Sequence, residues 1–100
     1  MSILSEILNE EYERLNRTLA SYEAMLAELP KGTIREKRIN GRVYKYLQWR
    51  ENAYVRSRYI KPQDVDTLSG LIERRRGYEN EIRSLRISKK EFDRVIGKEI

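Results

Sequence analysis

The chain has 100 residues and a formal net charge of +5, and 37% of its residues are charged while 39% are apolar. This length predicts a single domain, residues 1–100, with a modest core. The sequence contains no cysteine and no histidine. It therefore excludes disulfides and thiolate nucleophiles, and it argues against most zinc sites and the usual general base at neutral pH.

The amino-terminal residues predict a cytoplasmic protein. Residues 1–6 lack the basic region and the continuous apolar stretch of a signal peptide. No apolar run in the sequence approaches the length that crosses a bilayer. We therefore expect no membrane partner.

A coiled-coil seam runs through the first thirty residues. Apolar residues recur there in alternating steps of four and three, at Leu8, Tyr12, Leu15, Leu19, Tyr22, Leu26 and Leu29. This spacing predicts a helix over residues 1–29, beginning near Ser2 and about 42 Å long. Pro30 and Gly32 end it, because proline cannot continue a helix and glycine permits the chain to reverse.

Residues 31–61 concentrate the positive charge. They hold ten basic and two acidic residues, a net charge of +8, whereas residues 1–30 carry −4 and residues 62–100 carry +1. So uneven a distribution suggests a polyanionic partner. The alternative is a basic surface that contacts only solvent.

The same segment changes to the periodicity of strands. Asn40-Gly41 is a strong signal for a type I′ turn, because both central residues of that turn need a positive φ. A second two-residue turn is expected at Asn52-Ala53. The runs around these turns are rich in Ile, Val, Tyr and Trp. They predict a three-stranded antiparallel meander within residues 33–60, with strands Thr33–Ile39, Arg42–Glu51 and Tyr54–Ile60.

Two-residue turns fix the register of this sheet, so Arg35 faces Tyr46, which faces Tyr59. One face then carries Arg35, Lys37, Tyr44, Tyr46, Gln48, Arg50, Ser57 and Tyr59. The other carries Ile34, Val43, Leu47, Trp49 and Ile60, with Glu36, Arg38, Lys45, Arg56 and Arg58 among them. We favour the second as the core face, because it holds the aliphatic residues and the tryptophan. The opposite assignment is the alternative.

A second helix is predicted over residues 62–97. Pro62 suits a first helical turn, and nearby aspartates complement the helix dipole. Its seam consists of Leu68, Leu71, Arg75, Tyr78, Ile82, Leu85, Lys89, Phe92 and Ile96. Arg75 is expected to reach Glu11 or Glu23, or to extend the basic surface of the sheet. Ser88 to Glu91 resembles a capping box, so a break near Ser88 is an alternative to one continuous helix.

Gly70, Gly77 and Ser84 recur every seven residues and form one small-residue column. We expect the two glycines to lie against the sheet, with the helix pairing antiparallel with the first helix from about Tyr78 onward. The predicted fold is therefore α+β with the order αβββα, and its two long helices form an antiparallel, coiled-coil-like stalk.

Catalytic patterns are missing from the sequence. Without histidine, no serine has the usual activating base. The carboxylates of Glu10, Glu11 and Glu13, and those of Asp64 and Asp66, are expected on solvated helix surfaces instead of in a metal site. There is no Walker lysine motif and no GxGxxG. We expect neither enzyme activity nor a metal or cofactor.

Basic and aromatic residues of the sheet are the candidate binding site. Basic side chains attract phosphates, aromatic rings stack on unpaired bases, and a β-ribbon enters the DNA major groove. The predicted nucleic-acid or partner-binding residues are Arg35, Lys37, Arg42, Tyr44, Tyr46, Arg50, Arg56, Arg58 and Tyr59. Double-stranded DNA is favoured over single strands.

The central segment resembles a pattern in small uncharacterised proteins of prokaryotes and mobile elements. The matching residues are Leu29-Pro30-Lys31-Gly32-Thr33-Ile34, Gly41 to Arg50 as G-x-x-Y-x-Y-L-x-x-R, and the pair Tyr59-Ile60. That resemblance implies a phage-like context and no established activity. The sheet is more loosely similar to the three-stranded DNA-binding domains at the amino ends of phage integrases. This chain differs from those domains by a long first helix and a much longer last helix.

Two other functions and one assembly remain as alternatives. The protein could be a small phage- or mobile-element-encoded inhibitor or adaptor, resembling anti-CRISPR proteins in its role, that docks on a nucleic-acid-handling complex. It could also be a structural coiled coil that the sheet only caps. The heptads further allow a homodimer through the outer half of the first helix.

Overall fold

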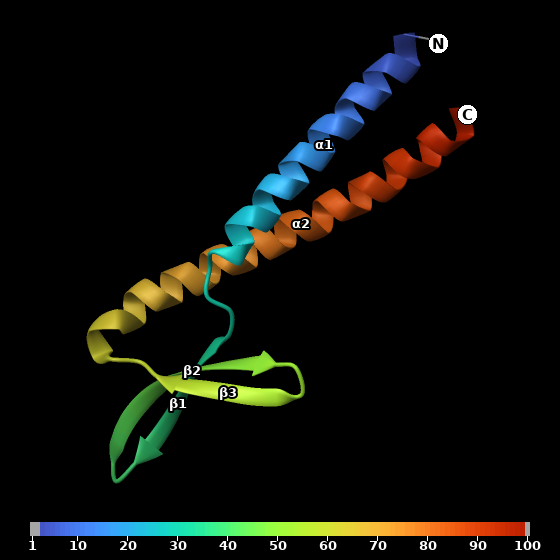
Figure 1. Cartoon of the computed structure of the whole chain (residues 1–100). Coiled ribbons are helices and arrows are strands. Elements are labelled where there is room, and N and C mark those ends of the chain that lie inside the picture. The colour runs from blue at the N-terminus through green and yellow to red at the C-terminus, as the bar shows by residue number, and fades with distance from the viewer. Residues whose placement is uncertain (1–2, 100) are drawn as a thin grey trace. The chain divides into compact units, whose positions relative to one another are not determined.

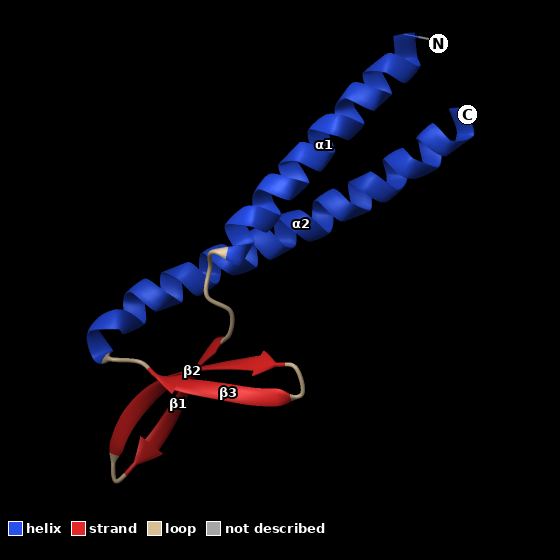
Figure 2. Cartoon of the chain, viewed as in Figure 1, coloured by secondary structure: helices blue, strands red, loops and turns tan. Residues whose placement is uncertain are grey.

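The computed structural model describes residues 3–99, and the side chains of residues 3–97 (Figure 1). Its elements are the helix α1 (Ile3–Ala27), the strands β1 (Thr33–Ile39), β2 (Arg42–Glu51) and β3 (Tyr54–Tyr59), the short 3₁₀ helix η1 (Pro62–Asp64) and the helix α2 (Val65–Glu99). The predicted order αβββα is confirmed (Figure 2). The residues at which the helices begin and end differ slightly from the predicted ones.

The chain divides into two compact units. The helical unit contains α1 and the part of α2 from Gly77 onward, and the sheet unit is Leu29–Arg76. The residues of the two predicted heptad seams form the packed inner side of the helical unit. Among the described residues of this unit, Leu19 and Ile82 are buried, and the other heptad residues are half-buried.

The two helices of the helical unit pack antiparallel. The ring of Tyr22 lies 5.4 Å from that of Tyr78, and the ring of Tyr12 lies 6.3 Å from that of Phe92. Early residues of α1 thus meet late residues of α2, which confirms the predicted antiparallel pairing. An ion pair of 2.9 Å joins the Arg86 guanidinium to the Glu23 carboxylate across the two helices.

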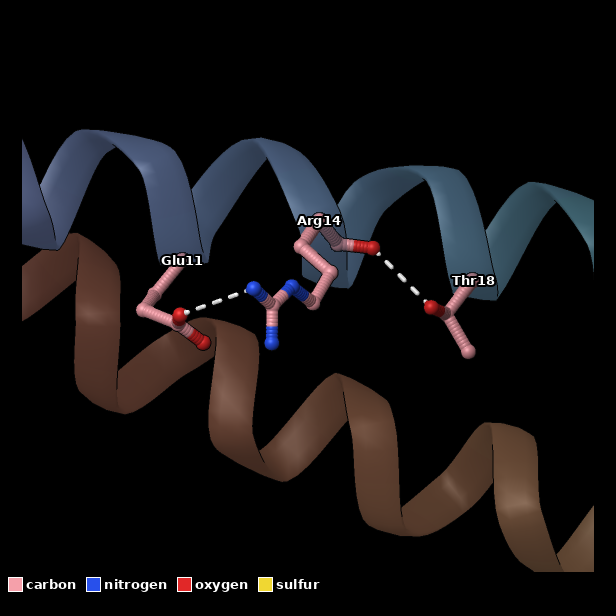
Figure 3. Close-up of polar contacts among 3 residues, drawn as sticks. All are labelled: Glu11, Arg14 and Thr18. Atoms are coloured by element: carbon pink, nitrogen blue, oxygen red, sulfur yellow. Dashed lines mark hydrogen bonds and ion pairs between the residues drawn. The ribbon is translucent and has the colours of Figure 1, made fainter.

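Local contacts link neighbouring turns of α1 beside its packed side (Figure 3). Arg14 Nη2 lies 3.5 Å from Glu11 Oε1, and the Thr18 hydroxyl donates to the Arg14 carbonyl oxygen at 3.0 Å. An exposed pair three residues apart contributes only a few tenths of a kcal/mol. The packing of the heptad residues therefore matters more to this helix than its surface charges.

The Tyr12 hydroxyl donates a hydrogen bond of 2.8 Å to Asp93 Oδ1. This bond to a carboxylate, helped by partial burial, raises the pKa of Tyr12 above the ordinary 10.0, against an opposing hydrogen bond with Asn16. The bond stabilises the fold below pH 10, and its contribution is lost as the pH rises through the higher pKa of the folded protein.

We expect Tyr12 to ionise at higher pH than an unperturbed tyrosine. NMR titration of ring-labelled tyrosines would measure this. The substitution Asp93→Ala should lower the pKa of Tyr12, because it removes the carboxylate that accepts the hydrogen bond from its hydroxyl. A pKa that does not change in this variant would contradict the assigned cause.

Turn chemistry sets the register of the sheet. Asn40 and Gly41 have φ values of 52° and 81°, as a type I′ turn requires, and Asn52 has a φ of 57°. Arg35 pairs with Tyr46, which pairs with Tyr59 on the far strand. Both turns and the full register are as predicted, in the order β1-β2-β3.

The core of the sheet unit lies on the predicted face. Leu47 and Ile60 from the sheet pack with Leu68 and Ile72 of α2, and all four side chains are buried. Three partly buried residues surround them: Ile34, Trp49 and Val65. Alternation along the strands places the aliphatic residues on this face, so burial of the four side chains stabilises the sheet and its covering helix together.

Arg75 is part of the sheet unit and holds the segment that follows α1. Its Nη1 atom donates a part-buried hydrogen bond of 2.6 Å to the carbonyl oxygen of Leu29. Glu23, one of its expected partners, forms an ion pair with Arg86. A guanidinium on the seam thus satisfies a backbone carbonyl just beyond the end of a helix, where such groups lack intrahelical partners.

We expect Arg75→Ala to lower the free energy of unfolding by about 1.5–3 kcal/mol, because it removes a charged hydrogen bond to a partly buried carbonyl. Urea denaturation followed by the fluorescence of Trp49, the single tryptophan, would measure the loss. The exposed neighbour Arg74 is the control, and Arg74→Ala should stay within about 0.5 kcal/mol of the wild type. Equal losses in both variants would contradict a specific role for Arg75.

The expectation of a close contact with the sheet, made for Gly70 and Gly77, is wrong for Gly70, which belongs to the sheet unit. A Cβ atom built on either glycine has no neighbour within 4 Å among the described residues. Leu68 and Ile72 face the sheet, and Gly70, halfway between them along the helix, points away. The small-residue column is therefore an exposed side of α2.

Both glycines should therefore weaken the helix without a packing benefit. We expect Gly70→Ala and Gly77→Ala each to raise the free energy of unfolding by about 1 kcal/mol, since glycine costs that much in a helix interior. Thermal and urea denaturation of the single and double variants would measure it. A loss of stability would show that something occupies the space beside these glycines.

The last helix does not break. It continues as an α-helix through Ser88 to Glu99, so the capping-box alternative is not realised. It begins three residues later than predicted, because Pro62 opens the single turn η1 before Val65 starts the α-helix. Similarly, α1 ends at Ala27, two residues before the predicted end.

Candidate nucleic-acid interface

The register divides the predicted site residues between two faces. Seven lie on the face opposite the core, here called the basic face: Arg35, Lys37, Arg42, Tyr44, Tyr46, Arg50 and Tyr59. Arg56 and Arg58 pair with Trp49 and Leu47, and therefore lie on the core face. The structure brings together the seven, but not these two arginines, as one surface.

Charge is segregated between the faces. The strands hold two carboxylates, Glu36 and Glu51, and both lie on the core face by alternation. There Lys45 Nζ lies 3.8 Å from Glu36, and Arg56 Nε lies 3.2 Å from Glu51. The two carboxylates thus neutralise the charge of bases on the core face.

The basic face has no such compensation. Its four bases, Arg35, Lys37, Arg42 and Arg50, are exposed. Among the described residues, no carboxylate forms an ion pair with any of them. Four positive charges on one side of a small sheet create a local field that attracts anions.

Three tyrosines form the aromatic part of this face. Tyr59 contacts both of the others, with ring centroids 6.2 Å from Tyr44 and 5.7 Å from Tyr46, and each pair is inclined by at least 60°. Lys37 Nζ lies 5.0 Å from the centroid of the Tyr46 ring. Tilted ring pairs and a cation over a ring stabilise cross-strand packing. These rings are therefore engaged with one another and with Lys37.

A cleft of about 270 Å³ adjoins the tyrosines at the edge of β2. β3 pairs with β2 only from Tyr46 onward, so the first residues of β2 have no strand on that side. The Ile60 amide closes the pairing with a 2.9 Å hydrogen bond to the Lys45 carbonyl oxygen. Asp66 also lines the cleft, which makes this edge less suited to phosphate than the bases further along the face.

Three polar residues of the basic face were absent from the predicted site. Thr33 pairs with Gln48, and Gln48 pairs with Ser57, so they form one row across the sheet. The alternation that placed the tyrosines on this face also places these residues there. Their side chains carry neither the charge nor the aromatic ring on which the predicted site was based.

The described part of the chain was expected to lack metal ligands and membrane spans, and two observations bear on these features. No group of three acidic residues there lies close enough together to hold a metal ion. None of the described helices combines the length and the apolar character that crossing a membrane requires.

Comparison with known families places most of these elements in one sequence family. A family model described as a domain of unknown function, DUF6788, matches residues 5–70. The chain belongs to the DUF6788 family. The DUF6788 match includes the whole sheet, and hence every residue of the basic face. No curated protein and no solved structure matches the chain.

Proposed function

We propose that this protein binds nucleic acid through the basic face, with double-stranded DNA favoured over single strands. The observation that carries the proposal is the segregation of charge. Four exposed bases lie without an acid on one face, while both strand carboxylates pair with bases on the other. The phosphates of nucleic acids are abundant anions that suit such a surface. When basic side chains neutralise them, condensed counterions are released, which favours binding.

The arrangement of the tyrosines supports a duplex ligand. Proteins that hold single strands usually offer free aromatic faces on which successive bases stack. Here Tyr59 contacts both of the other rings, and Lys37 lies over Tyr46. Contacts to phosphates, which a duplex presents in regular rows, need only the basic side chains.

Fluorescence anisotropy with random duplex and single-stranded oligonucleotides, at 50 and 200 mM salt, would test the proposal. Four phosphate contacts correspond to a salt slope of about −3.6, so duplex affinity should fall roughly 150-fold between these conditions. We expect tighter binding to the duplex than to the single strand. Absence of binding to both at low salt would overturn the proposal.

A protein partner is the second candidate, as in a phage-encoded inhibitor or adaptor of a nucleic-acid-handling complex. The second hairpin supports it, because two of its side chains are exposed: Val55, 57% exposed beside Arg50 on the basic face, and Tyr54, 70% exposed beside Glu51 on the core face. Tyrosine and arginine are enriched among the residues that dominate binding energy at protein interfaces. Partners that survive nuclease treatment in a pull-down, and are lost with Tyr54→Ser, would favour this function.

A further inference from the structure

The polar row of the basic face, Thr33, Gln48 and Ser57, does not contribute side-chain hydrogen bonds to the described fold. Thr33 and Gln48 are half-buried and Ser57 is exposed. Within the described residues, none of the three side chains makes a hydrogen bond. Two hydroxyls and one amide therefore lie side by side with their donors and acceptors available to a ligand.

Basic residues flank this row on both sides. The preceding row along β2 contains Arg35, paired with Tyr46, and the following row contains Arg50. The rows of Tyr46 and Arg50 are four residues apart, which corresponds to roughly 14 Å along a strand. The major groove of B-DNA is about 12 Å wide. Arg35 and Arg50 are thus spaced to meet phosphates on the two sides of the groove, with Gln48 between them.

The chemistry of the central residue points to a particular base. A glutamine amide carries both a donor and an acceptor, and it binds adenine at N6 and N7 through two hydrogen bonds. Hydroxyl groups accept or donate to any base edge, so Thr33 and Ser57 suit the neighbouring pairs. Phosphate contacts carry no sequence information, and the arginines alone would bind every duplex alike.

We propose that Gln48, flanked by Thr33 and Ser57, reads an A·T base pair in the major groove of a duplex held by the basic face. This inference rests on the proposed function and adds sequence preference to it. Arg35 and Arg50 position the sheet, and the polar row supplies the specificity.

Selection of bound duplexes from a random library would reveal the preference, and anisotropy would then quantify it. The wild type should bind the selected site roughly 5- to 150-fold more tightly than the same site with a G·C pair at the position read. Gln48→Ala should lose this ratio while its affinity for the G·C duplex and its salt slope stay unchanged. Gln48→Glu should move the selected base toward cytosine, whose N4 group donates to a carboxylate.

The outcomes separate this inference from the proposed function. If the wild type binds no duplex at low salt, the proposed function fails and the inference fails with it. If the wild type binds duplexes without preference, or Gln48→Ala keeps the A·T preference, only the inference is overturned. Thermal unfolding of each variant checks the fold, and Arg38→Ala, on the core face, serves as a matched control that should keep the preference.

Discussion

Alanine at Arg35, Lys37, Arg42 and Arg50 together is expected to weaken duplex binding by roughly 10²- to 10⁴-fold at 50 mM salt and to bring the salt slope close to zero. The reason is that these four exposed side chains are the uncompensated charges of the basic face. Each lost phosphate contact should lower the slope by about 0.9. Anisotropy titrations at four or more salt concentrations would measure both quantities.

A matched control removes the same charge from the other face. The variant with alanine at Arg38, Lys45, Arg56 and Arg58 has the same net charge and should keep most of the affinity and the salt slope, because these residues lie on the core face. Equal weakening of the two variants would show that the overall charge of the protein attracts DNA. The assignment of binding to one face would then be wrong.

Gly32→Ala is expected to cause the largest loss of stability, about 3–5 kcal/mol. Gly32 has a φ of 135°, a backbone conformation that side chains rarely adopt, and this alone costs about 1–3 kcal/mol. A Cβ atom there would also lie 2.6 Å from the carbonyl oxygen of Gln48 and 2.9 Å from a methyl carbon of Leu47. The first contact involves strand backbone, and the second disturbs the core.

Gly41 provides the control for this prediction. It has a φ of 81°, but a Cβ atom there has no neighbour within 4 Å among the described residues. Gly41→Ala should therefore cost only the backbone strain, about 1–2 kcal/mol. Urea denaturation of both variants would measure the difference. Losses of equal size would contradict the role of close packing at Gly32.

The sequence predicted the strands closely because turn chemistry and alternation are local. β1 and β2 begin and end at the predicted residues, and β3 ends one residue early. Once Asn40-Gly41 and Asn52-Ala53 are fixed as turns, each strand residue has one possible partner and one possible face. The seven site residues on the basic face follow from that register, although their role stays a prediction.

The helices were harder to predict in detail because their contacts are not local. Ile72 lies outside the heptad seam, yet it is one of the four buried residues of the sheet unit. The same seven-residue spacing that correctly predicted the helix pair suggested a close approach at Gly70 that does not occur. Likewise, nothing in the sequence around Arg75 indicates that its partner is the carbonyl of Leu29. Such contacts depend on how the elements pack.

The three-stranded sheet also has two open edges, and these have a consequence for solubility. β1 and β3 are its outer strands, so each presents unpaired backbone groups along one side. Arg35, Lys37 and Arg38 lie on one outer strand, and Arg56 and Arg58 lie on the other. Like charges on such edges repel a second copy and prevent sheets from joining edge to edge. Two of these edge bases, Arg35 and Lys37, are also ones that we propose for DNA binding, so a chain that no longer bound DNA would still need part of its positive charge.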